Sequence, residues 1–313
     1  MSGINAQSIK ELRERTLAGM SDCKGALVEA EGDMEKAVEI ILKKGLAKSA
    51  KKAGAVASEG EVRASVSADK RHATIVEVNI QTDFSARSDQ FKEYVGHVLA
   101  AAEKAAPGTE AGALDLHGKS ATDAAAELTG KIGEKIAPRR WDRVEVGHGK
   151  HGLAHAYVHL GGKIGVVIAL ETETAEAAHH PEVHKFADET VMQIAAMNAL
   201  VSERGQVNAE QVARQKDIFQ AQLKDDPKTA AKEAQWPKMV EGKLNKWYSE
   251  ITLLEQESVV VPGSTIEKLR EIAAKAAGGK VTITRFVRYE RGEGIEKAQK
   301  DDFAAEVAKM AGG

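Results

Sequence analysis

The sequence contains one cysteine, Cys23, among 313 residues. A single thiol cannot form an intramolecular disulfide, and cysteine-poor chains are typical of reducing compartments. The most apolar run, residues 164–170, is too short to cross a bilayer. The first residues, MSGINAQSIK, lack the apolar segment of a signal peptide. We therefore expect a cytoplasmic protein that does not span a membrane.

Neither sign of charge is in large excess, because 44 Lys and Arg residues are balanced by 47 Asp and Glu residues, for a net charge of −3. General nucleic-acid binding requires a surplus of positive charge, so this balance disfavours it. Aromatic residues make up only 4% of the chain, whereas the helix formers Ala, Glu and Lys are abundant. The length indicates about two to three domains.

Sequence motifs of cofactor binding and catalysis are also missing. The chain has no GxxxxGK[ST] loop and no GxGxxG after a predicted strand, so no nucleotide site is expected. Four histidines between residues 148 and 159 invite a metal interpretation, but the glycines among them oppose a helix, and no cysteine or obvious carboxylate accompanies them. Cys23 lacks a neighbouring histidine and is expected to be a core thiol. We expect no cofactor, no metal and no conventional enzymatic activity.

Residues 1–46 predict a compact unit of three short helices. Ser8 and Asp33 are suitable helix N-caps, and glycines mark the turns between the helices. The third helix is expected to end at Leu42, and the lysine-rich segment 43–58 is interpreted as a partly helical linker. The predicted core of the unit consists of Leu12, Leu27, Val28, Ala37, Val38, Ile41 and Leu42.

The middle of the chain contains a faint internal repeat. Strands are predicted at 61–67 and 71–80, followed by a helix at 90–104 with a regular apolar stripe. The segment VEVNIQTDF (76–84) resembles VVIALETET (166–174), 90 positions later, and the helices that follow align at an offset of 92. This alignment pairs Phe84 with Thr174. It indicates two related α+β subdomains, with chance similarity of two amphipathic patterns as the alternative.

The remaining segments predict an insertion, a hairpin and a closing module. Residues 107–131 are interpreted as a helix-rich insertion. Two charged segments, 208–224 and 229–250, are expected to form an antiparallel helical hairpin that projects from the body, either as a dimerisation or partner arm or without a binding role. A strand at 282–289 and a helix at 301–310 close the chain.

Together these elements predict an α+β fold with several units. The expected divisions are a three-helix domain with its linker at 1–54, a first core subdomain at 55–146, a second core subdomain at 147–201 and 252–280, the helical hairpin at 202–251, and a C-terminal helical module at 281–313.

Four segments carry a family resemblance: ELRERTLAGMSDCKGAL (11–27), EVNIQTDFSARSDQF (77–91), HLGGKIGVVI (159–168) and FVRYERGEGIEKAQKDDFAAEVA (286–308). In this order they are similar to the translation elongation factor Ts family, guanine-nucleotide exchange factors for elongation factor Tu. The resemblance implies an N-terminal domain like ubiquitin-associated modules, a core of two similar subdomains, a protruding coiled-coil hairpin and a C-terminal module. It also implies that the chain binds the GDP form of elongation factor Tu and promotes GDP release without holding nucleotide itself.

The resemblance further implies a set of partner-binding residues, transferred motif by motif. They are Thr82, Asp83 and Phe84 in the TDF motif, Met20 and Lys24 in GMSDCK, Ile132 and Gly133 in KIGE, His159 before GGKIGV, and, on a looser match, Val259 and Val260 in VVVPG. For each an ordinary structural role is the alternative, such as a core position for Phe84 or a buried strand for the two valines. Leu17 and Ser21 depart from the family pattern, and the loss of an apolar side chain at position 21 would weaken one N-terminal contact unless a neighbour compensates.

The leading hypothesis for Phe84 is a wedge that projects from a strand-to-helix corner and disturbs the Mg²⁺ and phosphate site of the partner. An RNA-associated helper that uses the lysine-rich segment is the main alternative function, although the charge balance weighs against it. A ubiquitin-binding module is a second alternative for the N-terminal unit. Whether the hairpin forms a homodimer or a 2:2 complex with the partner is left open.

Overall fold

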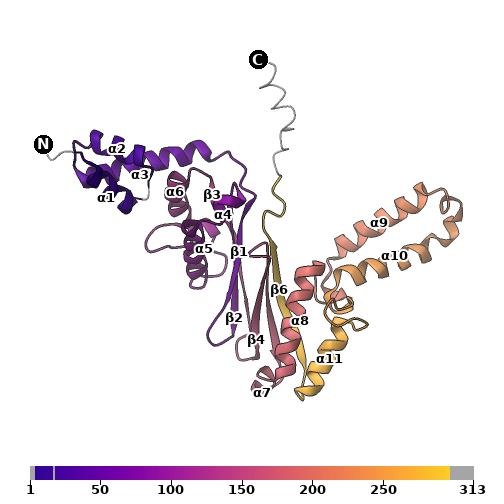
Figure 1. Cartoon of the computed structure of the whole chain (residues 1–313). Coiled ribbons are helices and arrows are strands. Elements are labelled where there is room, and N and C mark those ends of the chain that lie inside the picture. Colours follow the sequence, from indigo (N-terminus) through magenta and orange to yellow (C-terminus); the bar gives the residue numbers. More distant parts are fainter. Residues whose placement is uncertain (1–3, 17, 297–313) are drawn as a thin grey trace.

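The computed structural model describes residues 4–16 and 18–296 and combines helices with two three-stranded antiparallel sheets (Figure 1). The α+β class predicted from the sequence is confirmed. The strands are β1 (Glu59–Val66), β2 (His72–Ile80), β3 (Ile136–Glu145), β4 (His151–His159), β5 (Ile164–Thr172) and β6 (Val281–Glu290). The helices are α1 (Ala6–Thr16), α2 (Met20–Glu29), α3 (Met34–Lys52), α4 (Asp83–Ala86), α5 (Asp89–Ala102), α6 (Ala121–Ile132), α7 (Ala175–Ala178), α8 (Pro181–Met197), α9 (Ala209–Asp225), α10 (Trp236–Ile251) and α11 (Ile266–Ala276).

The two sheets pack face to face in the centre of the molecule. Their strand orders are β1-β2-β3 and β4-β5-β6, and Val62 and Ile75 from the first sheet are buried against Val167 from the second. Gly165 in β5 permits this close approach, because a Cβ atom there would lie 2.5 Å from a methyl carbon of Val62. Helices α5 and α6 cover the outer face of the first sheet, and α8 and α11 cover that of the second (Figure 1).

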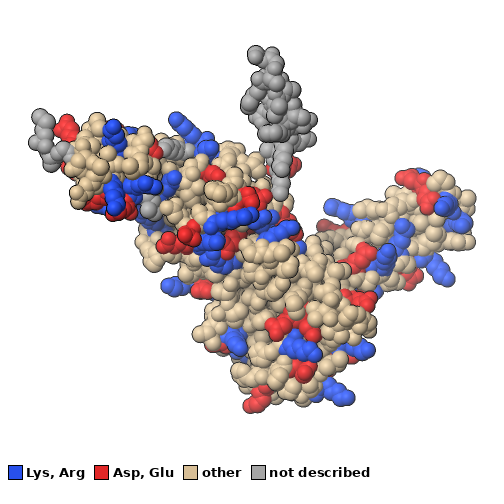
Figure 2. Space-filling model, viewed as in Figure 1, with Lys and Arg blue, Asp and Glu red and all other residues tan. Residues whose placement is uncertain are grey.

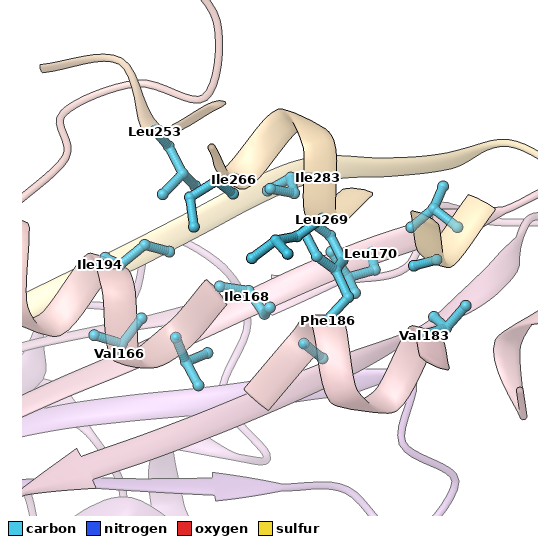
Figure 3. Close-up of a cluster of buried hydrophobic side chains, with 14 of the residues drawn as sticks. Val166, Ile168, Leu170, Val183, Phe186, Ile194, Leu253, Ile266, Leu269 and Ile283 are labelled. Carbon is cyan, nitrogen blue, oxygen red and sulfur yellow. The ribbon is translucent and has the colours of Figure 1, made fainter. Parts of the chain in front are cut away.

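The outer face of the second sheet shows how the apolar periodicity builds a core (Figure 3). Val166, Ile168 and Leu170 alternate along β5 and point to the same side of the sheet. They pack against Phe186 of α8 and Ile266 of α11, and all five side chains are buried. Burial of each such side chain stabilises the fold by about 1.5–3 kcal/mol. This core fixes the two helices from which the projecting hairpin emerges.

Equivalent positions in the two halves of the core lie a constant 92 residues apart. Strands β2 and β5 begin 92 residues apart, at His72 and Ile164, and also end 92 residues apart. A register shift between Ala169 and Leu170 of β5 repeats, at the same offset, the shift that begins at Glu77 of β2. The bulges are specific features of a strand, so their repetition supports the interpretation of two related subdomains.

This register corrects the strand alignment predicted from the sequence, which used an offset of 90. Thr82 and Thr174 each precede the short helix after the central strand, and each hydroxyl oxygen accepts a backbone N–H three residues later. These equivalent N-caps place Glu176, and not Thr174, at the position of Phe84. The apolar pattern permitted a slip of two residues because side chains alternate along a strand with a period of two.

The strand predicted at 282–289 belongs to the second sheet and not to a separate C-terminal module. β6 pairs antiparallel with β5, as β3 pairs with β2. The pairing joins segments more than a hundred residues apart, which local patterns do not reveal. The helix predicted at 301–310 lies outside the described residues.

The N-terminal unit contains three helices, of which the third is longer than the sequence analysis predicts. Helix α3 continues through the lysine-rich segment to Lys52, because Ala and Lys are strong helix formers. Leu12 and Leu27 are buried in the core of the unit together with Cys23. Val28 was placed in this core by the sequence analysis, but it is 58% exposed because it lies on the opposite face of α2 from the buried residues.

Helices α9 and α10 form an antiparallel hairpin that projects from the body of the molecule (Figure 1). Leu223 and Val240 are buried between the two helices. At the root, Arg204 pairs with Glu255, and its guanidinium group lies 4.8 Å from the ring centre of Tyr248. These contacts fix the direction in which the hairpin leaves the body. Within the described residues, no helix is both long enough and apolar enough to span a membrane.

Candidate partner-binding surface

Phe84 lies on the short helix α4, at the corner between β2 and α5. The hydroxyl oxygen of Thr82 accepts the Ser85 N–H at 3.2 Å and so caps this helix. Asp83 pairs with Arg87 at 3.0 Å on the exposed surface. Thr82 therefore has a structural role in the TDF motif, and Asp83 faces the solvent.

Glu134 holds the α4 corner from outside. Its carboxylate accepts hydrogen bonds from the Thr82 N–H at 3.0 Å, the Thr82 hydroxyl at 2.8 Å and the Ser85 hydroxyl at 2.7 Å. Hydrogen bonds to an ionised group are stronger than those between neutral groups. Three such bonds restrict the movement of the corner and therefore give the Phe84 ring a defined position.

The Phe84 side chain is 84% exposed, so the alternative that it fills the subdomain core is wrong. The inward position of the same short helix is occupied by Ala86, which is buried in the first-sheet core. An exposed phenylalanine forgoes about 1.5–3 kcal/mol of hydrophobic stabilisation. A large aromatic ring held rigidly in solvent is typical of an interface anchor.

Ile132 and Gly133 end helix α6, beside the α4 corner. Gly133 has a left-handed φ of 85° and donates its N–H to the Thr129 carbonyl at 2.8 Å, as helix C-caps do. Ile132 packs partly against the first-sheet core, so part of its role is structural. Gly133 is exposed and directly precedes Glu134, so this turn borders the corner that carries Phe84. In the segment predicted as a helix-rich insertion, only α6 and the short turn Ala111–Ala113 are helical.

Met20, Lys24 and Val28 are spaced four residues apart on α2 and share one exposed face. Met20 is 54% exposed, so the alternative that it is a core residue is wrong. Val28 was predicted to be a core residue, although its spacing from Lys24 indicates the same exposed face. Of the two departures from the family pattern, Ser21 is exposed, and Leu17 lies outside the described residues.

The turn between β4 and β5 carries His159 and Leu160. The Tyr157 hydroxyl lies 2.7 Å from Nδ1 of His159 and orients the half-buried imidazole ring. Leu160 is 68% exposed and has a φ of 48°, in the left-handed region that leucine rarely adopts. Leu160 is not among the residues predicted from the sequence, since no local pattern indicates this backbone conformation.

This turn lies at the same end of the sandwich as the α4 corner. The Val62 N–H donates to the Gly162 carbonyl at 2.8 Å, which ties the turn to the beginning of β1. The first residue of β1 pairs with the last residue of β2, just before the corner. The sheet pairing therefore brings Phe84 and Leu160 to one end of the molecule.

Val259 and Val260 lie in a loop that follows the hairpin, and both are exposed, so the buried-strand alternative is wrong. The Gln193 side-chain oxygen accepts the Val259 N–H at 2.8 Å, and the Ser258 hydroxyl accepts the Val260 N–H at 3.2 Å. Met197, one turn beyond Gln193 on α8, is exposed as well. These contacts attach the valine loop to α8 and not to the α4 corner, so it forms a separate part of the exposed apolar surface.

The histidines take part in ordinary surface contacts. Across residues 4–16 and 18–296, no group of three or more His, Cys, Asp or Glu side chains is arranged to hold a metal ion. His155 pairs with Asp188 at 2.7 Å. Burial, together with the nearby Lys70 and His155, lowers the pKa of His184. The described surface carries exposed apolar side chains, among them Phe84 and Leu160, on turns that hydrogen bonds hold in place.

The chain is similar to known proteins over its full length. Residues 81–293 match the family described as Elongation factor TS. A relative named Elongation factor Ts from Symbiobacterium thermophilum is 44% identical over 312 residues, which cover 100% of this chain and 99% of the relative. Relatives of the same name from Clostridium perfringens strain SM101 and Nitratiruptor sp. are 44% and 43% identical, cover 99% and 97% of this chain, and are themselves covered to 99% and 98%. The chain therefore belongs to the elongation factor Ts family.

Proposed function

We propose that this chain is a guanine-nucleotide exchange factor that promotes GDP release from elongation factor Tu. Family membership gives the general role of a translation elongation factor. The observation that carries the residue-level proposal is Phe84, an exposed ring on a corner that Glu134 holds in place. In this proposal the ring enters the partner and displaces the packing around its Mg²⁺ and phosphate site.

Exchange of this kind requires no catalytic acid, base or nucleophile from the factor. The factor binds the nucleotide-free conformer of the partner more tightly than the GDP-bound conformer, and this difference in binding free energy favours GDP release. By the same linkage, bound GDP weakens the affinity of the partner for the factor by the same ratio. Each tenfold increase in the release rate requires about 1.4 kcal/mol of barrier reduction. GTP then rebinds and the factor dissociates.

The surface residues act as anchors at separate points of the interface. We assign Met20, Lys24 and Val28 to the docking of the N-terminal unit. The contact at the end of the sandwich comprises Asp83, Phe84, Gly133, His159 and Leu160. Val259 and Val260 form a further contact. Because α4 and the β4–β5 turn are held by hydrogen bonds before the partner arrives, little conformational entropy is lost on binding.

The projecting hairpin is a second place for contact. We propose that α9 and α10 join two copies of the factor in a 2:2 complex with the partner, because the hairpin extends away from the body and exposes Ile218. Light scattering on the purified complex measures its mass directly. A mass equal to one factor and one partner at all concentrations would contradict this assignment.

An RNA-binding role has less support. The lysines of the predicted linker lie on α3, where Lys44 pairs with Glu29 at 2.6 Å and Lys43 pairs with Glu39 at 3.7 Å. Figure 2 shows acidic and basic side chains interspersed over the visible face. Lysines with carboxylate neighbours attract phosphate less strongly than isolated ones, so these pairs disfavour a phosphate-binding arm.

Stopped-flow release of fluorescent GDP from elongation factor Tu tests the proposed function. Addition of the chain at micromolar concentration is expected to accelerate release by about two or more powers of ten, which corresponds to about 3 kcal/mol. Unchanged release would contradict the proposal. A salt-sensitive gel shift of RNA by the same protein, without acceleration of GDP release, would favour the RNA-binding alternative.

A further inference from the structure

Helices α3 and α6 cross at a pair of glycines. Gly45 lies on α3, which extends from the N-terminal unit, and Gly130 lies on α6, which packs on the first sheet. A Cβ atom on Gly130 would lie 2.4 Å from the Gly45 Cα and 2.9 Å from the Gly45 carbonyl oxygen. In the other direction, a Cβ atom on Gly45 would lie 3.5 Å from the Gly130 Cα, which is an ordinary contact distance. The crossing therefore requires glycine at position 130 but accepts alanine at position 45.

Helix α6 connects the two parts of the proposed interface. It ends directly before Gly133 and Glu134, and the Glu134 carboxylate holds the α4 corner below Phe84. On its other side, α6 contacts α3. In the core of the N-terminal unit, α3 packs against α2, the helix whose exposed face carries Met20. The distance between the Met20 surface and the Phe84 corner therefore depends on how closely α3 approaches α6.

We infer that Gly130 is a positioning residue, which sets the place of the N-terminal unit relative to the α4 corner for partner binding. The inference rests on the proposed exchange function, because the two surfaces need a fixed spacing only if one partner contacts both. A second contact limits the ways in which α3 can move. Lys135 donates a hydrogen bond from Nζ to the Ala53 carbonyl at 2.7 Å, which holds the C-terminal end of α3 near the base of α6.

A methyl group at position 130 would push α3 away from α6 at the crossing. The start of α3, which lies farther along the helix, would move by more than the crossing itself. Relief of the 2.4 Å contact to an ordinary 3.4 Å requires about 1 Å of separation. With a rise of about 1.5 Å per residue, Gly45 lies about 12 Å from Ala53 and Met34 lies about 28 Å from it. A tilt about Ala53 therefore moves the start of α3 by about 2–3 Å. Productive binding geometries are held to within about 0.5 Å, so a shift of this size disrupts the docking of α2.

Alanine and leucine variants at helical glycines test the inference. Gly130→Ala is the test variant, and Gly45→Ala is its matched control at the same crossing. Gly242→Ala on α10 controls for helix propensity, because its added Cβ would meet no atom within 4 Å. Gly45→Leu separates α3 from α6 by adding a side chain on α3 instead of α6. It therefore tests the inference even if Gly130→Ala folds poorly. In the free full-length chain, amide hydrogen exchange around the crossing is expected to be about tenfold faster in Gly130→Ala and Gly45→Leu than in the two controls.

GDP release from elongation factor Tu gives the functional readout. Gly130→Ala is expected to raise the factor concentration for half-maximal release by about tenfold and to leave the limiting rate within about twofold. Gly45→Ala is expected to match the wild type. Met20→Ala should raise the half-maximal factor concentration by a smaller factor in the Gly130→Ala background than in the wild type, because the Met20 contact is already displaced there.

Two results would overturn the inference. One is wild-type hydrogen exchange and half-maximal concentration in both Gly130→Ala and Gly45→Leu. The other is an equal effect of Met20→Ala in the two backgrounds, which would show that position 130 does not act through the N-terminal surface. If the wild type itself fails to accelerate GDP release, the proposed function is wrong, and the hydrogen-exchange comparison still decides whether the crossing holds the N-terminal unit.

Discussion

At the scale of single residues, the TDF motif divides into a structural part and an exposed part. Thr82 caps α4, Asp83 lies in an exposed ion pair, and Phe84 faces the solvent. An exposed ion pair contributes at most about 1 kcal/mol to stability. In the second half of the core, Glu176 occupies the position of Phe84, so the shared fold does not depend on an aromatic residue there. Substitution of Phe84 therefore separates binding from stability.

Phe84→Ala is expected to slow GDP release from elongation factor Tu and to leave the fold intact. Truncation of an aromatic anchor in an interface costs about 2 kcal/mol or more, which is about 30-fold in rate. The melting temperature is expected to change by less than about 2 °C, because the ring makes no contribution to the core. Stopped-flow fluorescence and scanning calorimetry check the two parts of this prediction.

Phe91→Ala is the matched control, since Phe91 is fully buried in the first-sheet core. This variant is expected to lose about 3–5 kcal/mol of stability and to lose exchange activity only as it unfolds. A large loss of stability in Phe84→Ala, with normal GDP release, would instead identify Phe84 as a structural residue.

Leu160→Gly is expected to weaken partner binding without a loss of stability. The left-handed conformation costs leucine about 1 kcal/mol relative to glycine, and the side chain is exposed, so the substitution relieves strain. In the GDP-release assay the half-maximal factor concentration is expected to rise by about fivefold, or about 1 kcal/mol. Lys70→Gly, at another residue with a left-handed φ, is the control and should leave exchange unchanged. If Leu160→Gly behaved like Lys70→Gly, Leu160 would have no part in binding.

The sequence predicts the exposure of some of these residues but not of others. For Phe84, the residues alone left a core position and an exposed wedge as alternatives, and the family resemblance favoured the exposed ring. Leu160 was missed because its exposure depends on a turn that Val62, almost a hundred residues earlier, holds by a hydrogen bond to Gly162. The valine loop was uncertain for the same reason, since Gln193 of α8 shapes it from a distance.

At the scale of helices and strands, Glu134 joins the end of α6 to the α4 corner. Glu134→Ala removes three hydrogen bonds while the Thr82 cap remains. The expected loss of stability is about 1–2 kcal/mol, and GDP release is expected to slow because the Phe84 ring must then be ordered on binding. Thermal unfolding and stopped-flow fluorescence measure both effects.

Arg87→Ala provides the comparison for the Glu134 variant, because it breaks only the exposed ion pair with Asp83 on the same helix. It is expected to change stability by less than about 0.5 kcal/mol. If the two variants had the same effect on GDP release, rigid support of α4 by Glu134 would not be needed for exchange.

Apolar periodicity predicted most individual elements of the core but not their connections. The strands predicted at 61–67 and 71–80 and the helix predicted at 90–104 lie within two residues of the observed bounds. The two-residue slip in the repeat arose because a strand pattern is unchanged by a shift of two. The Thr82 and Thr174 caps and the repeated register shift distinguish the two alignments. The pairing of β6 with β5 was not predictable locally, since the hairpin separates them in sequence.

At the scale of the whole molecule, Glu77 links the two sheets through a buried network. Its carboxylate accepts hydrogen bonds from the Asn79 amide at 3.0 Å, Arg139 at 2.9 Å, Arg140 at 2.6 Å and the Gly292 N–H, after β6, at 2.8 Å. Burial alone would raise the pKa of Glu77, but the hydrogen bonds from Gly292, Asn79 and Arg140 outweigh it and lower the pKa. The ionised carboxylate is therefore favoured in the folded state.

Glu77→Gln is expected to destabilise the chain by about 3 kcal/mol at neutral pH, because Arg139 and Arg140 lose a buried counter-charge. Since folding lowers the pKa of Glu77 from its ordinary 4.5, the charge stabilises the fold above that value, and this stabilisation is lost as the pH falls through the lower folded-state pKa. The stability difference between wild type and variant, measured by urea denaturation, should therefore stay constant down to about pH 5 and shrink in more acidic solution. The exposed Glu145→Gln should change stability by less than about 0.5 kcal/mol. A Glu77→Gln difference that persists undiminished in acid would show that the network is held by shape and not by charge.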